Sequence, residues 1–257
     1  MKLAATIAVL LVAHPAATFV FRAAPPPGHS VTPAEMRRSV EVMRDRASAL
    51  GGNAEIRRVG TDRIAVRIGS RADAAAIAQK GRLEIYDLEA SLVRARPRPV
   101  PAGTVVVTCS RASAVVCPTP GGGAEPAPGQ TFRYLFRHRP ALTGEDVERR
   151  SVRRSTDPAT NAPIVTMALT PDGERAFEAL TRRVAVRGSH EGAAQHIAIV
   201  LDGALRAFPA IDYRQYPDGF DASAGLQLSG VPSAAEAKRL AVVLRTGELP
   251  VRFVPVR

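Results

Sequence analysis

The stretch "HIAIVLDGALRAFPAID" (residues 196–212) joins two apolar runs through Asp202 and Gly203. An Asp-Gly pair between apolar runs is a strong signal of a β-hairpin, because both central turn positions can take a positive φ. The aspartate could instead be a catalytic group, and the two interpretations lead to different classes of protein. No catalytic signature accompanies it, so we predict two neighbouring strands with Asp202 at their corner.

The segments around this hairpin alternate between helix and strand patterns. Residues 170–185 and 232–247 carry apolar residues at intervals of three and four, and Thr170 and Ser233 are favourable N-caps for the two helices. A further short helix is predicted at "TGEDVERR" (residues 143–150). Strands are predicted from alternating apolar residues at 131–139, 162–169 and 249–256.

The N-terminal third of the chain predicts the order strand, helix, strand, strand, helix, strand. Its first helix, at 32–50, has the most complete signals, with Thr32 as N-cap, Pro33 in the first turn and Glu35 completing a capping box. The apolar face of this helix is expected to contain Met36, Val40, Met43, Ala47 and Leu50. The other elements are expected at 18–23, 54–60, 62–69, 72–80 and 82–90. This order is that of the ferredoxin-like unit, in which two helices cover one face of a sheet.

Composition places the 257-residue chain among globular proteins with an aliphatic core, since 46% of residues are hydrophobic and Trp is absent. The net charge is +11, and residues 94–154 supply +7 of it through eleven Arg against four acidic residues. Compositional bias of the source genome can account for part of this excess. The region is either a solvated basic face or a surface for anionic headgroups or an acidic protein. No zinc, helix-turn-helix or RNA-binding motif accompanies the charge, so we expect no nucleic-acid partner.

The N-terminus carries an apolar stretch. Lys2 precedes "LAATIAVLLVA" (residues 3–13), which suits the core of a signal peptide and is too short to span a bilayer. Extending the stretch through Phe21 gives nineteen residues, enough for an anchor, although Pro15 interrupts it. Residues 1–17 are therefore expected to be a signal peptide or an N-terminal anchor, and the protein is expected to be extracytoplasmic.

The two cysteines fit an oxidising compartment. Cys109 and Cys117 enclose seven residues and can pair there. A metal pair or a redox dithiol would call for C-x-x-C spacing or for further ligands nearby. We predict a structural disulfide.

A search for catalytic and metal-binding patterns finds none. His190 and His196 are six residues apart, whereas the zinc-protease motif needs a separation of four. Ser189 is not in a nucleophile-elbow pattern, and the aspartates of residues 212–221 lack the glycine and distal Glu of a calcium loop. The glycine-rich residues 118–126 lack the Lys-Ser/Thr of a phosphate-binding loop. We expect no catalytic residue, no cofactor and no metal; the residues that bind a partner are not predicted.

Several segments together resemble one family. They are "SVEVMRDRASALGG", "RRVGTDRIAVRIG", "LTGEDV", "PIVTMALTPDGERAFEALT", "IAIVLDGALRAFPAI" and "LSGVPSAAEAKRLAVVLRTGELPV". In this order they are similar to the first periplasmic domain of SecD, the protein translocase subunit that works with SecF. The resemblance implies an α+β fold, with a ferredoxin-like base (βαββαβ plus a returning C-terminal strand) and an inserted α+β head, the P1 head subdomain. It also implies that the head holds an emerging preprotein.

The resemblance also implies a division of the chain. It gives an N-terminal leader at 1–17, a base at 18–93 with the returning strand at 248–257, a Pro/Gly/Arg-rich linker with the disulfide loop at 94–130, and a head at 131–247. SecD continues into a transmembrane bundle whose buried ionisable residues couple it to the proton gradient. This sequence stops at Arg257, so we expect it to lack that bundle.

The expected function is that of a non-enzymatic, extracytoplasmic accessory module in Sec-dependent export. Its expected partners are unfolded preprotein and Sec translocon membrane subunits, SecF-like and SecY-like. The alternative is an envelope tether that binds anionic lipid or polymer through the basic region 94–154.

Overall fold

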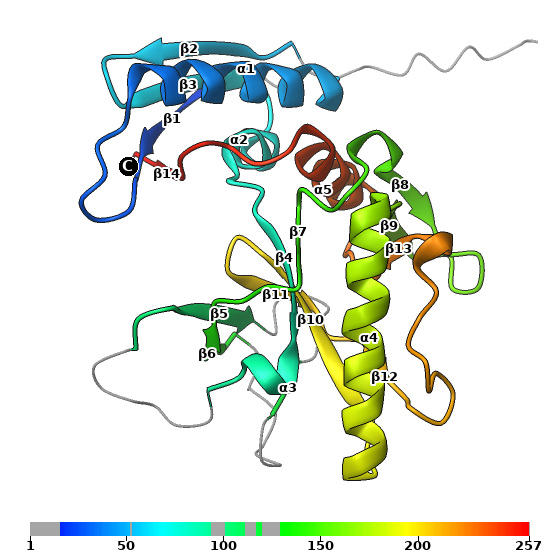
Figure 1. Cartoon of the computed structure of the whole chain (residues 1–257). Helices are drawn as coiled ribbons and strands as arrows, with labels where there is room; N and C mark the ends of the chain where they lie inside the picture. Colours follow the sequence, from blue (N-terminus) through cyan, green and yellow to red (C-terminus); the bar gives the residue numbers. More distant parts are fainter. Residues whose placement is uncertain (1–15, 52, 94–100, 111–116, 120–128, 257) are drawn as a thin grey trace, which may run out of the picture.

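The computed structural model of the protein describes residues 16–51, 53–93, 101–110, 117–119 and 129–256. They form two parts, a smaller base and a larger head, which lie one above the other in Figure 1. The base contains both ends of the described chain, and the head is inserted between its second helix and its last strand.

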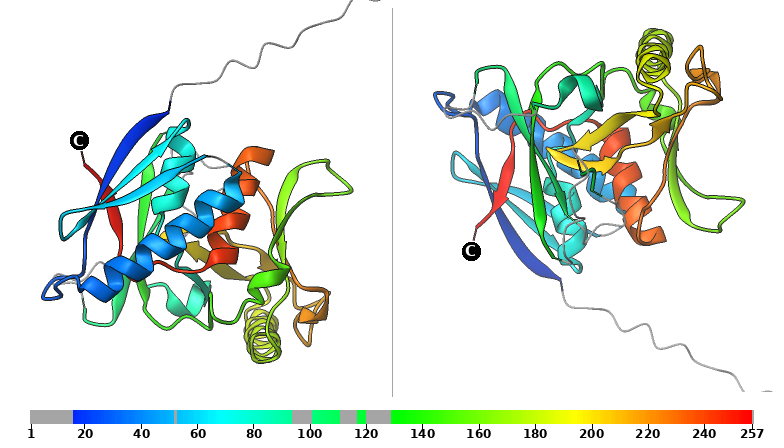
Figure 2. Two further views of the ribbon diagram at one scale, coloured as in Figure 1. Left: turned by 90° about the horizontal axis from the view of Figure 1, so that it is seen from above. Right: turned by 90° about the horizontal axis from the view of Figure 1, so that it is seen from below.

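The base is a four-stranded antiparallel sheet in the order β14-β1-β3-β2. Its elements are β1 (Ala17–Ala23), α1 (Pro33–Leu50), β2 (Glu55–Val59), β3 (Arg63–Ile68), α2 (Arg71–Ala78) and β14 (Phe253–Pro255). The two helices share one apolar cluster with the inner face of the sheet. Figure 2 shows β14, in red, beside β1, in dark blue, although they lie at opposite ends of the sequence.

Helix α1 confirms its predicted signals. The Thr32 side chain accepts a hydrogen bond from the Glu35 backbone N–H, the Glu35 carboxylate accepts one from the Thr32 N–H, and Gly51 ends the helix at φ 75°. The predicted apolar residues are buried. Burying a large aliphatic side chain stabilises the fold by about 1.5–3 kcal/mol, so this face fixes the helix on the sheet.

The head is built around a seven-stranded sheet in the order β6-β5-β11-β10-β4-β7, with β12 also paired to β10. These strands are β4 (Leu83–Asp87), β5 (Thr104–Ser110), β6 (Thr131–Arg137), β7 (Leu142–Thr143), β10 (Gln195–Leu201), β11 (Ala204–Ala207) and β12 (Ala210–Ile211). A three-stranded sheet, in the order β13-β9-β8, contains β8 (Arg153–Thr156), β9 (Pro163–Met167) and β13 (Leu226–Leu228). The helices of the head are α3 (Leu88–Ser91), α4 (Pro171–Glu191), α5 (Ala234–Thr246) and the 3₁₀ turns η1 (Arg149–Ser151) and η2 (Ala222–Ala224).

The hairpin prediction is confirmed. Strands β10 and β11 are antiparallel and meet at Leu201 and Ala204, and both turn residues have positive φ, 55° at Asp202 and 76° at Gly203. The Asp202 carboxylate accepts a hydrogen bond of 2.8 Å from the Arg82 backbone N–H. Strand β10 is almost wholly buried, because it pairs with β4, β11 and β12.

Three expectations about local structure are corrected. Residues 83–87 do not close the base sheet, because β4 pairs with β10 and β7 in the head; β14 takes the position beside β1. The stretch predicted as linker, 94–130, contains strand β5, which pairs with β6 and β11. The short helix predicted at 143–150 is instead a turn followed by η1, because the Asp146 carboxylate folds back to accept the Thr143 N–H at 2.7 Å.

Candidate functional site

The two connections between base and head run side by side. The chain leaves the base just after α2 and returns just after α5, and the Leu249 N–H donates to the Lys80 carbonyl at 2.8 Å. The Lys80 ammonium also donates to the carbonyls of Leu249 and Pro250, and it lies 2.8 Å from the Glu248 carboxylate. These two adjacent segments, residues 79–82 and 247–252, join the head to the base, and we call them the crossover.

Arg46, on α1, lies under this crossover and is fully buried. Its guanidinium donates to the carbonyls of Ile77 (3.0 Å) and Gln79 at the end of α2, and to the Gly247 carbonyl (2.6 Å) just past α5. Its Nε donates to the Thr246 hydroxyl at 3.0 Å. One side chain thus holds both connections.

No carboxylate lies within 4.0 Å of this guanidinium among the described residues, so its charge faces carbonyl dipoles instead. The C-terminal ends of two helices carry partial negative charge, which favours a cation at this point. Burial nevertheless lowers the pKa of Arg46 to about 10, with the charge of Asp202 acting in the opposite direction. The arginine remains charged at neutral pH.

A groove of about 1330 Å³ lies beside the crossover, between the base and the head. The base contributes β1, β14 and the exposed side of α2, including Ala72 and Ala75. The head contributes Arg206 of β11, the loop at 228–233 and the start of α5. Pockets that bind extended or apolar ligands are concave, mostly apolar and furnished with a few polar groups, and this groove has that character.

One wall of the groove contains a free strand edge. Strand β14 pairs with β1 only from Phe21 to Ala23, and one further hydrogen bond joins the Val256 N–H to the Val20 carbonyl at 2.8 Å. Because alternate residues of a strand direct their backbone groups to the same edge, the N–H and C=O of Thr18 lie on this side as well. No described strand pairs with β1 there. An extended peptide could add to such an edge through main-chain hydrogen bonds.

The polar groups of the groove come mainly from arginines. Arg239 of α5 donates to the Asp73 carboxylate of α2 at 2.7 Å, and this contact joins the two helices. It also lies 3.4 Å from the Glu236 carboxylate on its own helix. The hydrogen bond to Asp73 raises the pKa of Arg239. The Nε of Arg206, by contrast, is buried and has no hydrogen-bond partner in the described part of the chain. A buried N–H without an acceptor is unfavourable, so a carbonyl oxygen brought by a ligand would stabilise it.

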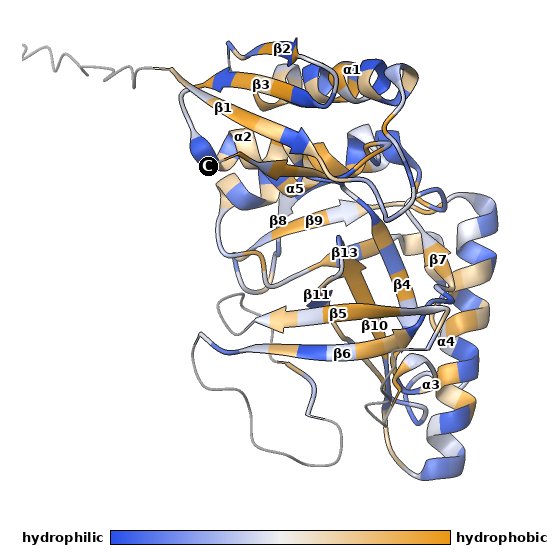
Figure 3. Ribbon diagram, turned by 90° about the vertical axis from the view of Figure 1, so that its left-hand side faces the viewer, coloured by the Kyte–Doolittle hydropathy of each residue, from blue (hydrophilic) through white to orange (hydrophobic). Residues whose placement is uncertain are grey.

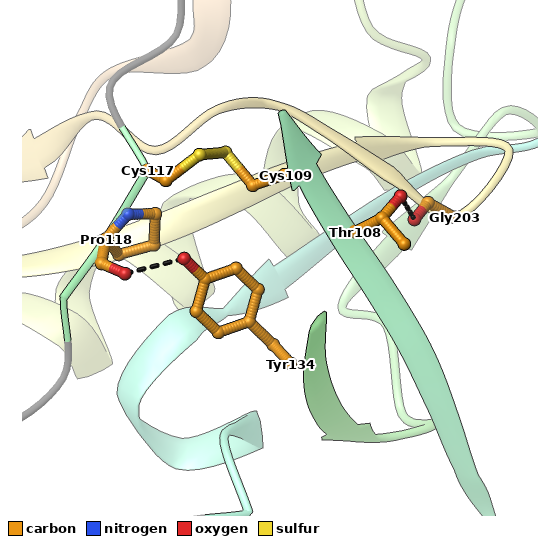
Figure 4. Close-up of a disulfide and its surroundings, with 6 residues drawn as sticks. All are labelled: Thr108, Cys109, Cys117, Pro118, Tyr134 and Gly203. Atoms are coloured by element: carbon orange, nitrogen blue, oxygen red, sulfur yellow. Dashed lines mark hydrogen bonds between the residues drawn. A yellow bond between two sulfur atoms is a disulfide. The ribbon is translucent and has the colours of Figure 1, made fainter. Parts of the chain in front are cut away.

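The cysteines predicted to pair are joined in the structure, where the Cα atoms of Cys109 and Cys117 are 5.8 Å apart (Figure 4). Cys109 is the last residue but one of strand β5, and both cysteines belong to a buried cluster with Tyr134 and Phe136 of β6. Burial raises the pKa of Tyr134 to about 12, so its hydroxyl stays protonated and donates to the Pro118 carbonyl at 2.6 Å. Neither the disulfide nor Tyr134 lines the groove.

The histidines and the serine considered in the catalytic search lie apart. His196 Nδ1 is 2.8 Å from a Glu89 oxygen, a pair that joins β10 to α3, whereas His190 is exposed near the end of α4. The Ser189 hydroxyl donates to the Val186 carbonyl of its own helix at 2.8 Å. Over the described ranges, no cluster of three or more His, Cys, Asp or Glu side chains could hold a metal ion.

The basic region 94–154 does not form one surface among its described residues. Arg133 and Arg137 lie on β6 at one edge of the head sheet, whereas Arg153 and Arg154 lie on β8 in the separate three-stranded sheet. The residues at 94–100, which hold three of its arginines, lie outside the described part. Its proposed role as a tether stays a prediction.

The structure is thus a two-part α+β domain. A small base sheet carries a larger inserted head, and Arg46 binds both segments that connect them. Comparison with known proteins identifies its family: the model of the SecDF P1 head subdomain matches residues 123–251, about half of the chain. The chain belongs to this family, the periplasmic P1 domain of SecD and SecDF.

Curated relatives agree with this assignment. The chain is 35% identical over 112 residues to the protein translocase subunit SecDF of Thermus thermophilus, covering 44% of this chain and 13% of that protein. It is 34% identical over 120 residues to the SecD subunit of Calditerrivibrio nitroreducens, covering 47% and 20%. A longer match, 29% over 181 residues, covers 70% of the chain and 31% of SecD from Elusimicrobium minutum. The chain thus spans less than a third of the length of these relatives.

Two solved structures share the fold. A SecDF structure described as the super-membrane-facing form has a TM-score of 0.59 at 24% identity, over 93% of this chain and 29% of that one. A second, described as a membrane component that enhances protein export, has a TM-score of 0.56 at 23% identity and is covered to 98%. These likenesses show a mixed α+β fold of the SecDF periplasmic type. None of the helices within residues 16–256 that the structure describes is long and apolar enough to cross a bilayer.

Proposed function

We propose that the protein is an extracytoplasmic, non-catalytic module that holds an extended, unfolded polypeptide during Sec-dependent export. Its relatives are named as translocase subunits, and one structural neighbour is described as enhancing protein export. The observation that carries the proposal is the groove between base and head, with its apolar lining and the free edge of β1.

The groove suits a chain of varied sequence. Main-chain hydrogen bonds to a strand edge do not depend on the side chains of the ligand, and apolar walls accept aliphatic and aromatic residues alike. The unpartnered Nε of Arg206 adds a donor for one peptide carbonyl. A partner in the Sec translocon, SecF-like or SecY-like, would present the emerging preprotein to this groove.

We further infer that the base is ferredoxin-like. The connection order β1-α1-β2-β3-α2 followed by β14, with the sheet order β14-β1-β3-β2, supports this, and the head is then the insertion between α2 and β14. On this division, the base contains residues 17–81 and 248–256, since Ala17 is part of β1, and the expected leader is shortened to 1–16. The head contains 82–247, so that it includes β4, β5 and the disulfide.

Site-specific photocrosslinking tests the proposal. A photoreactive residue in place of Ala75, which is exposed in the groove, should crosslink to a stalled secretory substrate. The same residue in place of Val186, which is exposed on α4 away from the groove, should not. Ala75→Trp, which fills part of the groove, should lower the affinity for an unfolded polypeptide. Equal crosslinking from both positions, or none from Ala75, would overturn the assignment of the groove.

A further inference from the structure

The outer face of the base sheet carries four arginines. Arg63 and Arg67 of β3 lie on the same side of the sheet as Ala65, which stands two residues from each of them. Arg22 of β1 pairs with Arg63, and Arg57 of β2 pairs with Ala65. All four arginines therefore share one face. All four are exposed. This face is opposite to the one on which Phe21, Ile64 and Val66 pack against α1 and α2.

The charge of this face is nearly all of one sign. Glu55 is the only carboxylate among its described residues, and it lies 4.0 Å from Arg67; Asp62, in the adjoining turn, is 3.9 Å from Arg63. Arg22 and Arg57 have no carboxylate within that distance in the described chain. The exposed side of α1, in contrast, alternates Arg37, Arg38 and Arg44 with Glu41 and Asp45.

Valines lie between the arginines. Val59 and Val256 are 37% and 39% exposed, and they are two of the four large hydrophobic residues that the described chain leaves exposed. The register places Val59 opposite Arg63 and Val254 opposite Arg22. Val256 follows Val254 by two residues, so it lies on the same side as the arginines, at the end of the strand where the groove begins. Figure 3 views the base with β1 and β3 in front, and shows polar and apolar positions mixed along these strands. We call this surface the arginine face; it consists of Arg22, Arg57, Arg63, Arg67, Val59, Val254 and Val256.

We propose that the arginine face docks on an anionic phospholipid bilayer. Guanidinium groups pair with phosphate, their aliphatic stems and the valines reach the level of the headgroups, and the flat sheet needs no complementary cleft. The sequence before the sheet points to the same occupant. The apolar residues 3–13 end four residues before β1, a connection that spans at most about 14 Å. A membrane that holds residues 3–13 thus lies within reach of this sheet.

Vesicle binding by the full chain tests the docking. Affinity for vesicles that contain phosphatidylglycerol should exceed affinity for pure phosphatidylcholine, and the excess should fall with added salt. The variant Arg57→Gln/Arg63→Gln/Arg67→Gln should lose on the order of 100-fold of that excess, since each cation near an anionic surface contributes roughly a factor of five. The control Arg37→Gln/Arg44→Gln/Arg183→Gln removes the same charge from other exposed positions and should keep most of it.

A single tryptophan gives an independent measurement, because the chain has none. The emission of Val59→Trp should shift to shorter wavelength on anionic vesicles, whereas that of Val186→Trp, on α4, should not. Equal losses in the two arginine variants, or equal shifts from the two tryptophans, would overturn the proposal. Absence of any preference for anionic vesicles would overturn it too, and would leave an acidic protein as the occupant. None of the substituted residues lines the groove, so failure here leaves the proposed function intact.

Discussion

Replacing Arg46 by methionine should destabilise the protein by about 4 kcal/mol. The side chain donates charge-assisted hydrogen bonds to the carbonyls of Ile77, Gln79 and Gly247, each worth about 1.5–3 kcal/mol. Burial lowers the pKa of Arg46 from its ordinary value of 12.5 to about 10, so keeping the cation buried costs about 3 kcal/mol. Methionine removes that cost but leaves the carbonyls without donors, and the loss of hydrogen bonds is the larger effect.

Urea denaturation followed by far-ultraviolet circular dichroism measures this change. A loss of about 4 kcal/mol corresponds to a fall of roughly 10 °C in Tm for a chain of this size. Arg46→Lys keeps the charge but not the planar fork, so we expect a smaller loss. Arg44→Met, at an exposed position of the same helix, should change the free energy of unfolding by less than about 0.5 kcal/mol. An unchanged denaturation midpoint for Arg46→Met would refute the reasoning.

Three further predictions concern other parts of the head. Burial alone would raise the pKa of Glu89, but hydrogen bonds from His196 hold that pKa below its ordinary value. The stability that the ionised Glu89 contributes should therefore be lost as the pH falls through the lowered pKa. In Glu89→Gln, the free energy of unfolding should depend less on pH in this acidic range. Thiol alkylation followed by mass spectrometry should find Cys109 and Cys117 unreactive until reduction, and replacing both by Ser should cost about 2–3 kcal/mol in thermal denaturation. Asp202→Ala should destabilise the protein by about 1 kcal/mol, because alanine adopts the positive φ of 55° at this position only with strain. Asp202→Gly should destabilise it by less, since glycine adopts that φ readily. If calorimetry found the glycine variant less stable than the alanine variant, the turn assignment would be contradicted.

Elements with strong local signals could be predicted from the sequence. The capping box at Thr32 and Glu35, and the apolar spacing that follows, fix α1 without help from the rest of the chain. The Asp202-Gly203 turn likewise depends on backbone conformations that few residues adopt. Helix α4 buries Phe177, Leu180 and Val184 as its pattern predicts.

The sheet that a strand joins could not be predicted in the same way. Residues 83–87 have a pattern that fits a strand in either sheet, and only the pairing of β4 with β10 decides between them. Strand β5 was hidden because it lies between Pro- and Gly-rich segments that are typical of linkers, although its run of Thr and Val favours a strand. The alternation of apolar and polar residues along a strand indicates which face of the strand is buried, but it does not indicate which other strand lies beside it.

The groove was missed for a related reason, since its walls come from β1, α2, β11, α5 and β14, which are far apart in the sequence. Arg46 did leave a signal. It follows Met43 by three residues and precedes Leu50 by four, so it occupies a position on the apolar face of α1. An arginine in an apolar register must find several acceptors, and here the acceptors are the carbonyls where two connections cross.

The position of Arg46 links stability to the groove. The walls of the groove belong partly to the base, through β1 and α2, and partly to the head, through residues 228–233, so its width depends on the crossover that Arg46 holds. Arg46→Lys should therefore weaken crosslinking from Ala75 to an unfolded polypeptide while leaving vesicle binding by the arginine face unchanged, because that face lies wholly on the base sheet. If both activities fell together, the substitution would be acting through general loss of structure, and Arg46 would have no specific part in shaping the groove.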